Sequence, residues 1–124
     1  MSEFMGNLRR NSMCGTLRSS DVGKEVTVMG WTQRRRNLGS LIFVDLRDKT
    51  GLVQVVFDDT TDEKVFEKAQ NIRSEYVLAV KGKVRERESK TNKIATGEIE
   101  ILADELKILS EADTTPFEIL DDSN

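Results

Sequence analysis

The sequence predicts an all-β protein in which five strands form a barrel and one helix lies between the third and fourth strands. Short runs rich in Val, Ile, Phe and Thr recur along the 124 residues, and turn-forming residues separate them. One stretch near the middle of the chain changes from strand spacing to helix spacing. A chain of this length forms one domain and can bury a single hydrophobic core.

The first half of the chain predicts three strands joined by tight turns. Their ranges are 25–35, 41–47 and 52–57. Gly39 with the serine after it, and the Asp-Lys-Thr-Gly stretch at 48–51, contain the residues that favour turns. Two successive hairpins of this kind predict an antiparallel meander.

A single helix is predicted after the third strand. Thr60 and Glu63 have the spacing of a capping box, in which the two side chains satisfy unpaired backbone amides at the start of a helix. Val65, Ala69 and Ile72 then recur at positions i, i+4 and i+7, which is the spacing of one helix face. This pattern predicts a helix of about three turns.

Two more strands are predicted, at 76–87 and 98–109, on either side of a polar loop. The order of three strands, one helix and two strands is that of the OB-fold, a five-stranded Greek-key barrel that binds oligonucleotides on one face. A small SH3-like barrel lacks this helix, and a ferredoxin-like fold needs a second one. We therefore predict an OB-fold at 14–112, an N-terminal arm at 1–13 and the start of a linker at 113–124.

The composition excludes several classes of function. The chain has no histidine, so histidine-based acid/base catalysis and Ser-His-Asp triads are impossible. Its one cysteine, Cys14, cannot form an internal disulfide, which suits a reducing cytoplasm. There is no calcium-loop or phosphate-loop motif, and no run of about 18 apolar residues that would cross a membrane. We therefore expect a cytoplasmic binding module with no catalytic site, no metal site, no cofactor and no membrane partner.

The charge is distributed unevenly along the chain. Residues 1–97 carry 18 Lys+Arg against 13 Asp+Glu, a net charge of +5, whereas residues 98–124 have a net charge of −8. Basic residues cluster in the Arg-Arg-Arg run at 34–36 and again between 81 and 93. A locally basic face is compatible with nucleic-acid binding even at a net charge of −3. A single charge run, however, is more often an ordinary solvated surface.

Strand alternation places an aromatic and two polar side chains on one outer face. Successive residues of a strand point to opposite sides, so Phe43 projects away from its apolar neighbours in the second strand. Gln54 in the third strand and Glu100 in the fifth fall on the same face by this count. Phe43 offers a base a stacking surface, and Gln54 offers a donor and an acceptor. Each has an ordinary alternative, namely a core phenylalanine, a surface glutamine and a surface acid, but their coincidence favours nucleic-acid binding.

The segment GWTQRRRNLGSLIFVDLRDKTGLVQVVFD at 30–58 resembles the N-terminal anticodon-binding domain of bacterial-type aspartyl-tRNA synthetases. The same resemblance is carried by CGTLRSSDVGKEVTVMGW at 14–31 and by VKGKVRERESKTNKIATGEIEIL at 80–102. TTPFEIL at 114–120 is similar to the segment that leads into the catalytic domain of that family. The resemblance covers residues 6–120. Lysyl- and asparaginyl-tRNA synthetases share the fold, but their sequence strings differ.

The resemblance implies a role for each matching residue. Phe43 would stack on the central uridine of the anticodon, and Gln54 would hydrogen-bond to that base. Arg36 and Glu100 would take part in reading the anticodon. Weaker candidates for RNA contact are Arg34, Arg35, Arg85, Arg87, Lys90 and Asn92.

The resemblance also implies a function, the binding of the anticodon loop of aspartate tRNA. The chain itself would not be an enzyme, because the catalytic domain expected after the linker at 113–124 is absent. The parent protein would be an ATP-dependent aspartate–tRNA ligase that uses Mg²⁺ and forms a homodimer. Two alternatives stay open, a free-standing single-strand-binding OB protein with little sequence preference and a protein-binding module on the same scaffold.

Overall fold

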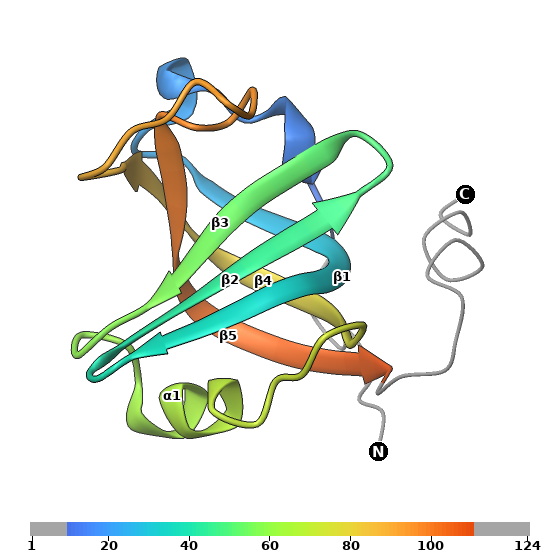
Figure 1. Cartoon of the computed structure of the whole chain (residues 1–124), viewed down its shortest axis with the longest axis vertical. Helices are drawn as coiled ribbons and strands as arrows, with labels where there is room; N and C mark the ends of the chain where they lie inside the picture. The colour runs from blue at the N-terminus through green and yellow to red at the C-terminus, as the bar shows by residue number, and fades with distance from the viewer. Residues whose placement is uncertain (1–9, 111–124) are drawn as a thin grey trace.

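The five predicted strands close into a barrel in the computed structural model, which describes residues 10–110 (Figure 1). Their bounds are β1 Glu25–Leu38, β2 Leu41–Asp48, β3 Gly51–Phe57, β4 Val77–Glu86 and β5 Ile99–Ser110. The order around the barrel is β1-β2-β3-β5-β4, and only β3 and β5 run parallel. The predicted five-stranded barrel with one helix between the third and fourth strands is confirmed.

The first strand is longer than predicted because it belongs to two sides of the barrel. β1 pairs with β4 from Glu25 to Trp31 and with β2 from Trp31 to Leu38. A bulge between Thr32 and Arg34 shifts the register at the junction, and bulges of this kind bend a strand. The strand therefore continues to the tip of the β1–β2 hairpin instead of ending at residue 35.

The helix is shorter than predicted and begins at a different cap. α1, Glu63–Ala69, has seven residues, about two turns, where the spacing predicted three. Its N-cap is Asp62, whose carboxylate accepts a hydrogen bond from the backbone N of Lys64 at 2.8 Å. Thr60 does not cap the helix, because its hydroxyl donates to the Asp58 carboxylate at 2.6 Å. The predicted cap was wrong by two positions for this reason.

The helix closes one end of the barrel. Val65 and Phe66 pack against the core, and Ala69 and Ile72 are buried in it. α1 lies at the opposite end of the barrel from the β4–β5 loop (Figure 1). Because the helix covers an end, it leaves the outer face of β2 and β3 open.

Alternate residues of β2 fill the barrel, as the sequence predicts. Ile42, Val44 and Leu46 are fully buried. The residues between them face outward, since β2 has an alternating pattern of buried and half-buried positions. The outer face of β2 is therefore available for binding.

The barrel closes along a short parallel contact, which we call the seam. Only two residue pairs join β3 to β5 there, Val55 with Ile101 and Val56 with Leu102. The antiparallel pairs of the barrel are much longer, with ten residue pairs between β4 and β5. The seam is thus the least extensively paired junction between neighbouring strands.

Two short 3₁₀ helices, η1 Cys14–Thr16 and η2 Ser19–Asp21, precede β1. Cys14 is fully buried, and its backbone N donates to Asp48 Oδ2 at 2.7 Å. Burial, together with the nearby Asp48 carboxylate, raises the pKa of the Cys14 thiol. This cysteine therefore belongs to the packed interior and stays protonated.

The end of the predicted arm lies against the barrel. The backbone N of Asn11 donates to Thr27 O at 3.0 Å, and its side chain accepts from Thr27 N at 2.9 Å. The remainder of the arm up to residue 9 and the predicted linker at 113–124 lie outside the described residues. Within 10–110, no helix is long and apolar enough to cross a membrane.

Candidate nucleic-acid interface

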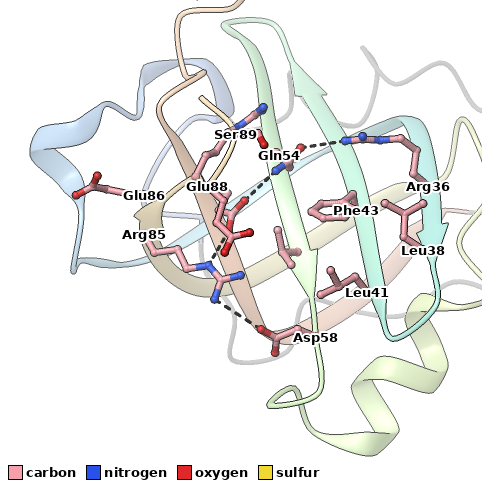
Figure 2. Close-up of a pocket in the computed structure, with 13 residues that line it drawn as sticks. Arg36, Leu38, Leu41, Phe43, Gln54, Asp58, Arg85, Glu86, Glu88 and Ser89 are labelled. Carbon is pink, nitrogen blue, oxygen red and sulfur yellow. Dashed lines mark hydrogen bonds and ion pairs between the residues drawn. The ribbon is translucent and has the colours of Figure 1, made fainter. Parts of the chain in front are cut away.

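A cleft of about 650 Å³ lies on the outer face of the barrel (Figure 2). Apolar residues from the β1–β2 hairpin and from β3 form one part of it, and charged residues from β4, the β4–β5 loop and β5 form the other. The lining residues are Arg36, Leu38, Leu41, Phe43, Gln54, Val56, Asp58, Arg85, Glu86, Arg87, Glu88, Ser89 and Glu100. The four principal residues predicted from the sequence, and two of the six weaker candidates, are among them.

Gln54 lies between two charged side chains (Figure 2). Arg36 Nη2 donates to Gln54 Oε1 at 3.0 Å, and Gln54 Nε2 donates to Glu100 Oε1 at 2.8 Å. Gln54 and Glu100 are each only 6% exposed, so they form the floor of the cleft and not an open surface. A guanidinium only donates and a carboxylate only accepts. The Gln54 amide oxygen is therefore assigned to the side of Arg36, and its NH₂ group to the side of Glu100.

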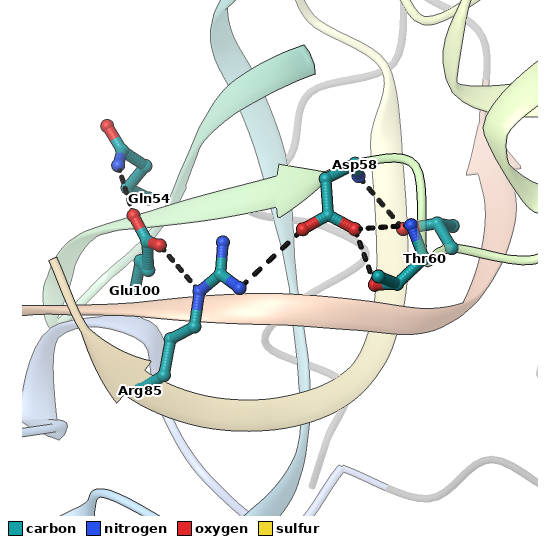
Figure 3. A network of polar contacts seen from close by, with 6 residues as sticks. Gln54, Asp58, Thr60, Arg85 and Glu100 are labelled. Carbon is teal, nitrogen blue, oxygen red and sulfur yellow. Dashed lines mark hydrogen bonds and ion pairs between the residues drawn. The ribbon is translucent and has the colours of Figure 1, made fainter. Parts of the chain in front are cut away.

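A row of hydrogen bonds and ion pairs continues from Glu100 to the end of β3 (Figure 3). Arg85 Nε donates to Glu100 Oε2 at 2.7 Å, and Arg85 Nη1 lies 3.6 Å from Asp58 Oδ2. Burial alone would raise the pKa of Asp58, but hydrogen bonds from Thr60 and the charge of Arg85 outweigh it and lower the pKa. Asp58 is therefore ionised at neutral pH and anchors one end of this row.

Phe43 lies beside this row of polar side chains and outside the core. It is directly opposite Arg36 in the β1–β2 register, so both side chains share the outer face. The Arg36 guanidinium carbon lies 5.0 Å from the centroid of the Phe43 ring, within the range of a cation–π contact. Phe43 is half-buried and does not belong to the buried core cluster. The alternative that Phe43 is a core residue is therefore not supported.

The cleft is not strongly basic, although the sequence suggested a basic face. Its lining holds three arginines and four carboxylates. Arg87 is half-buried, and its Nε donates to Ile99 O at 3.2 Å. Burial lowers the pKa of Arg87, while the charges of Glu100 and Asp45 oppose this shift. Because arginines and carboxylates alternate here, the cleft is better suited to recognising nucleobases than to binding phosphate groups.

Two of the weaker candidates lie on β1 outside the cleft and on opposite faces. Arg34 pairs with Asp45 and so shares the outer face of β2. Arg35 pairs with Val44, which is fully buried, and so falls on the other face. The structure thus keeps Arg34 near the cleft and separates Arg35 from it.

The basic cluster between 81 and 93 does not form a single surface. Arg85 and Arg87 line the cleft, but Lys81 forms ion pairs elsewhere, 3.5 Å from Glu105 Oε2. Lys90 and Asn92 are exposed on the β4–β5 loop, and neither lines the cleft. The distance along β4 and the β4–β5 loop therefore divide a run that is continuous in sequence.

Sequence reasoning missed several residues of the cleft. Val56 and Asp58 have the same strand parity as Gln54, and Leu41 has the same parity as Phe43, so alternation alone would have placed them there. Leu38, which is 58% exposed, gave no signal of this kind.

In the part of the chain that the structure describes, no group of acidic or sulfur side chains is arranged to hold a metal ion.

The comparisons with known proteins agree with the fold. The family model for the tRNA anti-codon OB-fold nucleic acid binding domain matches residues 26–109. An aspartate–tRNA(Asp/Asn) ligase of Thermoanaerobacter pseudethanolicus is 56% identical over 126 aligned residues, covering 100% of this chain and 21% of that protein. An aspartate–tRNA ligase of Clostridium perfringens is 53% identical over 122 residues, covering 98% of this chain and 20% of that protein. The chain spans about a fifth of the length of these curated relatives.

A solved structure shows the same barrel. An asparaginyl-tRNA synthetase from Pyrococcus horikoshii, complexed with asparaginyl-adenylate, matches with a TM-score of 0.73 and 27% sequence identity. The match covers 89% of this chain and 24% of that one. The OB-fold predicted from the order of elements is therefore confirmed both by sequence and by three-dimensional similarity.

Proposed function

Since the chain belongs to the family of tRNA anti-codon OB-fold nucleic acid binding domains, we propose that it binds the anticodon loop of aspartate tRNA. The whole-chain similarity to aspartate–tRNA ligases supports the choice of tRNA. The observation that carries the proposal is the cleft, in which Phe43, Gln54 and Glu100 meet on one face. Each of these residues has a distinct task in binding an unstacked base.

Phe43 supplies stacking and Gln54 supplies hydrogen bonds. Single-stranded bases splay out of an RNA loop and stack on aromatic rings, while their edges pair with polar side chains. The central uridine of the anticodon lies on Phe43 and pairs with the amide of Gln54. Arg36 contacts both Phe43 and Gln54, and it takes part in binding this base or its neighbour. Glu100 takes part in reading the anticodon at the cleft floor, where its negative charge disfavours phosphate.

In this proposal the chain is the recognition domain of a larger ATP-dependent aspartate–tRNA ligase. That protein uses Mg²⁺, forms a homodimer and works in the cytoplasm. The greater length of the relatives supports this view. Binding at the anticodon selects the tRNA, because discrimination between tRNAs is a difference between their affinities.

Binding of two RNA stem-loops that differ only at the central anticodon base tests the proposal. Replacing uridine by cytidine exchanges a donor and an acceptor on the base edge and leaves a buried polar group unpaired, which costs about 1–3 kcal/mol. The domain should therefore prefer the uridine loop by roughly tenfold or more in fluorescence anisotropy titrations. Equal affinity for both loops would identify a non-specific single-strand binder, and no RNA binding would favour a protein-binding module.

A further inference from the structure

Gln54 by itself cannot distinguish uridine from cytidine. Position 4 of the ring is an acceptor in uridine and a donor in cytidine, and N3 is a donor in uridine and an acceptor in cytidine. A glutamine amide has a donor at one end and an acceptor at the other. If the amide is free to turn by half a rotation, it pairs with either base held at one place on Phe43. Discrimination therefore requires something that prevents the turn.

The structure contains such a restraint. Glu100 accepts from Gln54 Nε2 at 2.8 Å, and Arg36 donates to Gln54 Oε1 at 3.0 Å on the other side. We propose that Glu100 is a positioning residue that fixes the Gln54 amide in one orientation, and that this orientation makes Gln54 selective for uridine. The inference rests on the proposed function, because it concerns how the same cleft selects its base.

Burial makes the reverse orientation costly. A turned amide would place its NH₂ group against the Arg36 donors and its oxygen against the Glu100 carboxylate. Gln54 and Glu100 are 6% exposed, so water has little access to compensate for the mismatched contacts. Buried polar groups that lose their partners are expensive, and more so when charged groups are involved.

Glu100 is itself held in place from the opposite side. Arg85 Nε donates to its second carboxylate oxygen at 2.7 Å, and Arg85 is in turn close to the ionised Asp58. Both carboxylate oxygens of Glu100 therefore have a charge-assisted or amide partner, and such bonds are among the stronger ones in proteins. The restraint on Gln54 is thus anchored in two strands, β4 and β5, and does not depend on a flexible loop.

The Glu100→Gln substitution tests the inference with almost no change in shape. The new amide can donate or accept, so only the hydrogen bond from Arg36 still favours one orientation of Gln54. We expect the preference for the uridine loop to fall from tenfold or more to about threefold or less. The ratio of the two affinities is the readout, because loss of a contact to another base or to the backbone weakens both loops equally and leaves this ratio unchanged. Glu105→Gln is the matched control, since it removes the same charge from β5 outside the cleft.

Arg85→Gln provides a second variant at a half-exposed position. It frees one oxygen of Glu100, so the uridine preference should also fall, by less than in Glu100→Gln. Melting curves establish that each variant is folded before its affinities are compared. An unchanged ratio in folded Glu100→Gln would overturn the inference while leaving the proposed function intact. Failure of the proposed function would be visible earlier, as equal affinity of the unsubstituted domain for the two loops.

Discussion

Replacing Phe43 with alanine separates RNA binding from folding. Stacking of a base on an aromatic ring contributes about 1–3 kcal/mol, so the affinity for an anticodon stem-loop should fall by about 5- to 150-fold. The ring lies outside the core cluster, and its contact with Arg36 is a cation–π pair. Such a pair at a partly exposed site contributes about 0.5–1 kcal/mol. The free energy of unfolding should therefore drop by only about 1 kcal/mol.

Phe57→Ala is the matched control for Phe43→Ala. Phe57 is fully buried in the barrel, so its truncation should cost about 3–5 kcal/mol of unfolding free energy. Its remaining folded fraction should keep its RNA affinity, because the side chain does not line the cleft. Urea denaturation gives the free energy of unfolding of each variant, and anisotropy titration gives its affinity for RNA. If Phe43→Ala lost stability like Phe57→Ala and kept its affinity, the assignment of the ring to the binding face would be refuted.

Three further predictions concern the polar residues. Gln54→Ala should bind uridine and cytidine loops weakly and almost equally; retained discrimination would assign the base reading to another residue. The Asp58 pKa is lowered from 3.8, so its carboxylate stabilises the fold above that pH, and the contribution disappears as the pH falls through the folded-state pKa. Asp58→Asn should therefore flatten the acid part of a plot of unfolding free energy against pH, and an unaltered plot would contradict this. Arg34→Gln should reduce the log–log salt slope of binding by about 0.7, the value for one phosphate on single-stranded RNA. Lys81→Gln is its control and should leave the slope unchanged, since Lys81 pairs with acids outside the cleft.

Strand alternation was sufficient to predict much of the cleft. The apolar positions of β2 repeat with period two, so the side on which Phe43 lies follows from the sequence alone. The argument is weaker for Gln54, because Leu52 and Val56 lie on the same face of β3 and the burial pattern there does not alternate. The placement of Phe43 needed no knowledge of how the strands pair, because a strand with one apolar face, such as β2, has only one way to pack on a core.

The sequence did not determine contacts that depend on register or on local competition for hydrogen bonds. Arg85 meets Glu100 because β4 and β5 pair these two residues, with a bulge farther along the same pair of strands. No local pattern specifies that register. The start of α1 was misplaced for a different reason, since Thr60 binds Asp58 and so cannot cap the helix. Thr60 and Asp62 are both suitable helix caps. Thr60 forms hydrogen bonds in the turn after β3 instead, and Asp62 caps the helix.

The hydrogen bond between Gln54 and Glu100 lies beside the seam of the barrel. Gln54 precedes Val55 and Glu100 precedes Ile101, which form one of the two residue pairs of the seam. The hydrogen bond between the Gln54 and Glu100 side chains therefore bridges β3 and β5 beside the barrel's least extensive backbone pairing. A barrel can close only if the strands at this junction stay in register, and that register in turn fixes the distance between the two side chains. Because strand-borne groups are positioned more accurately than loop-borne ones, the bond that helps close the barrel also holds the Gln54 amide in a defined place.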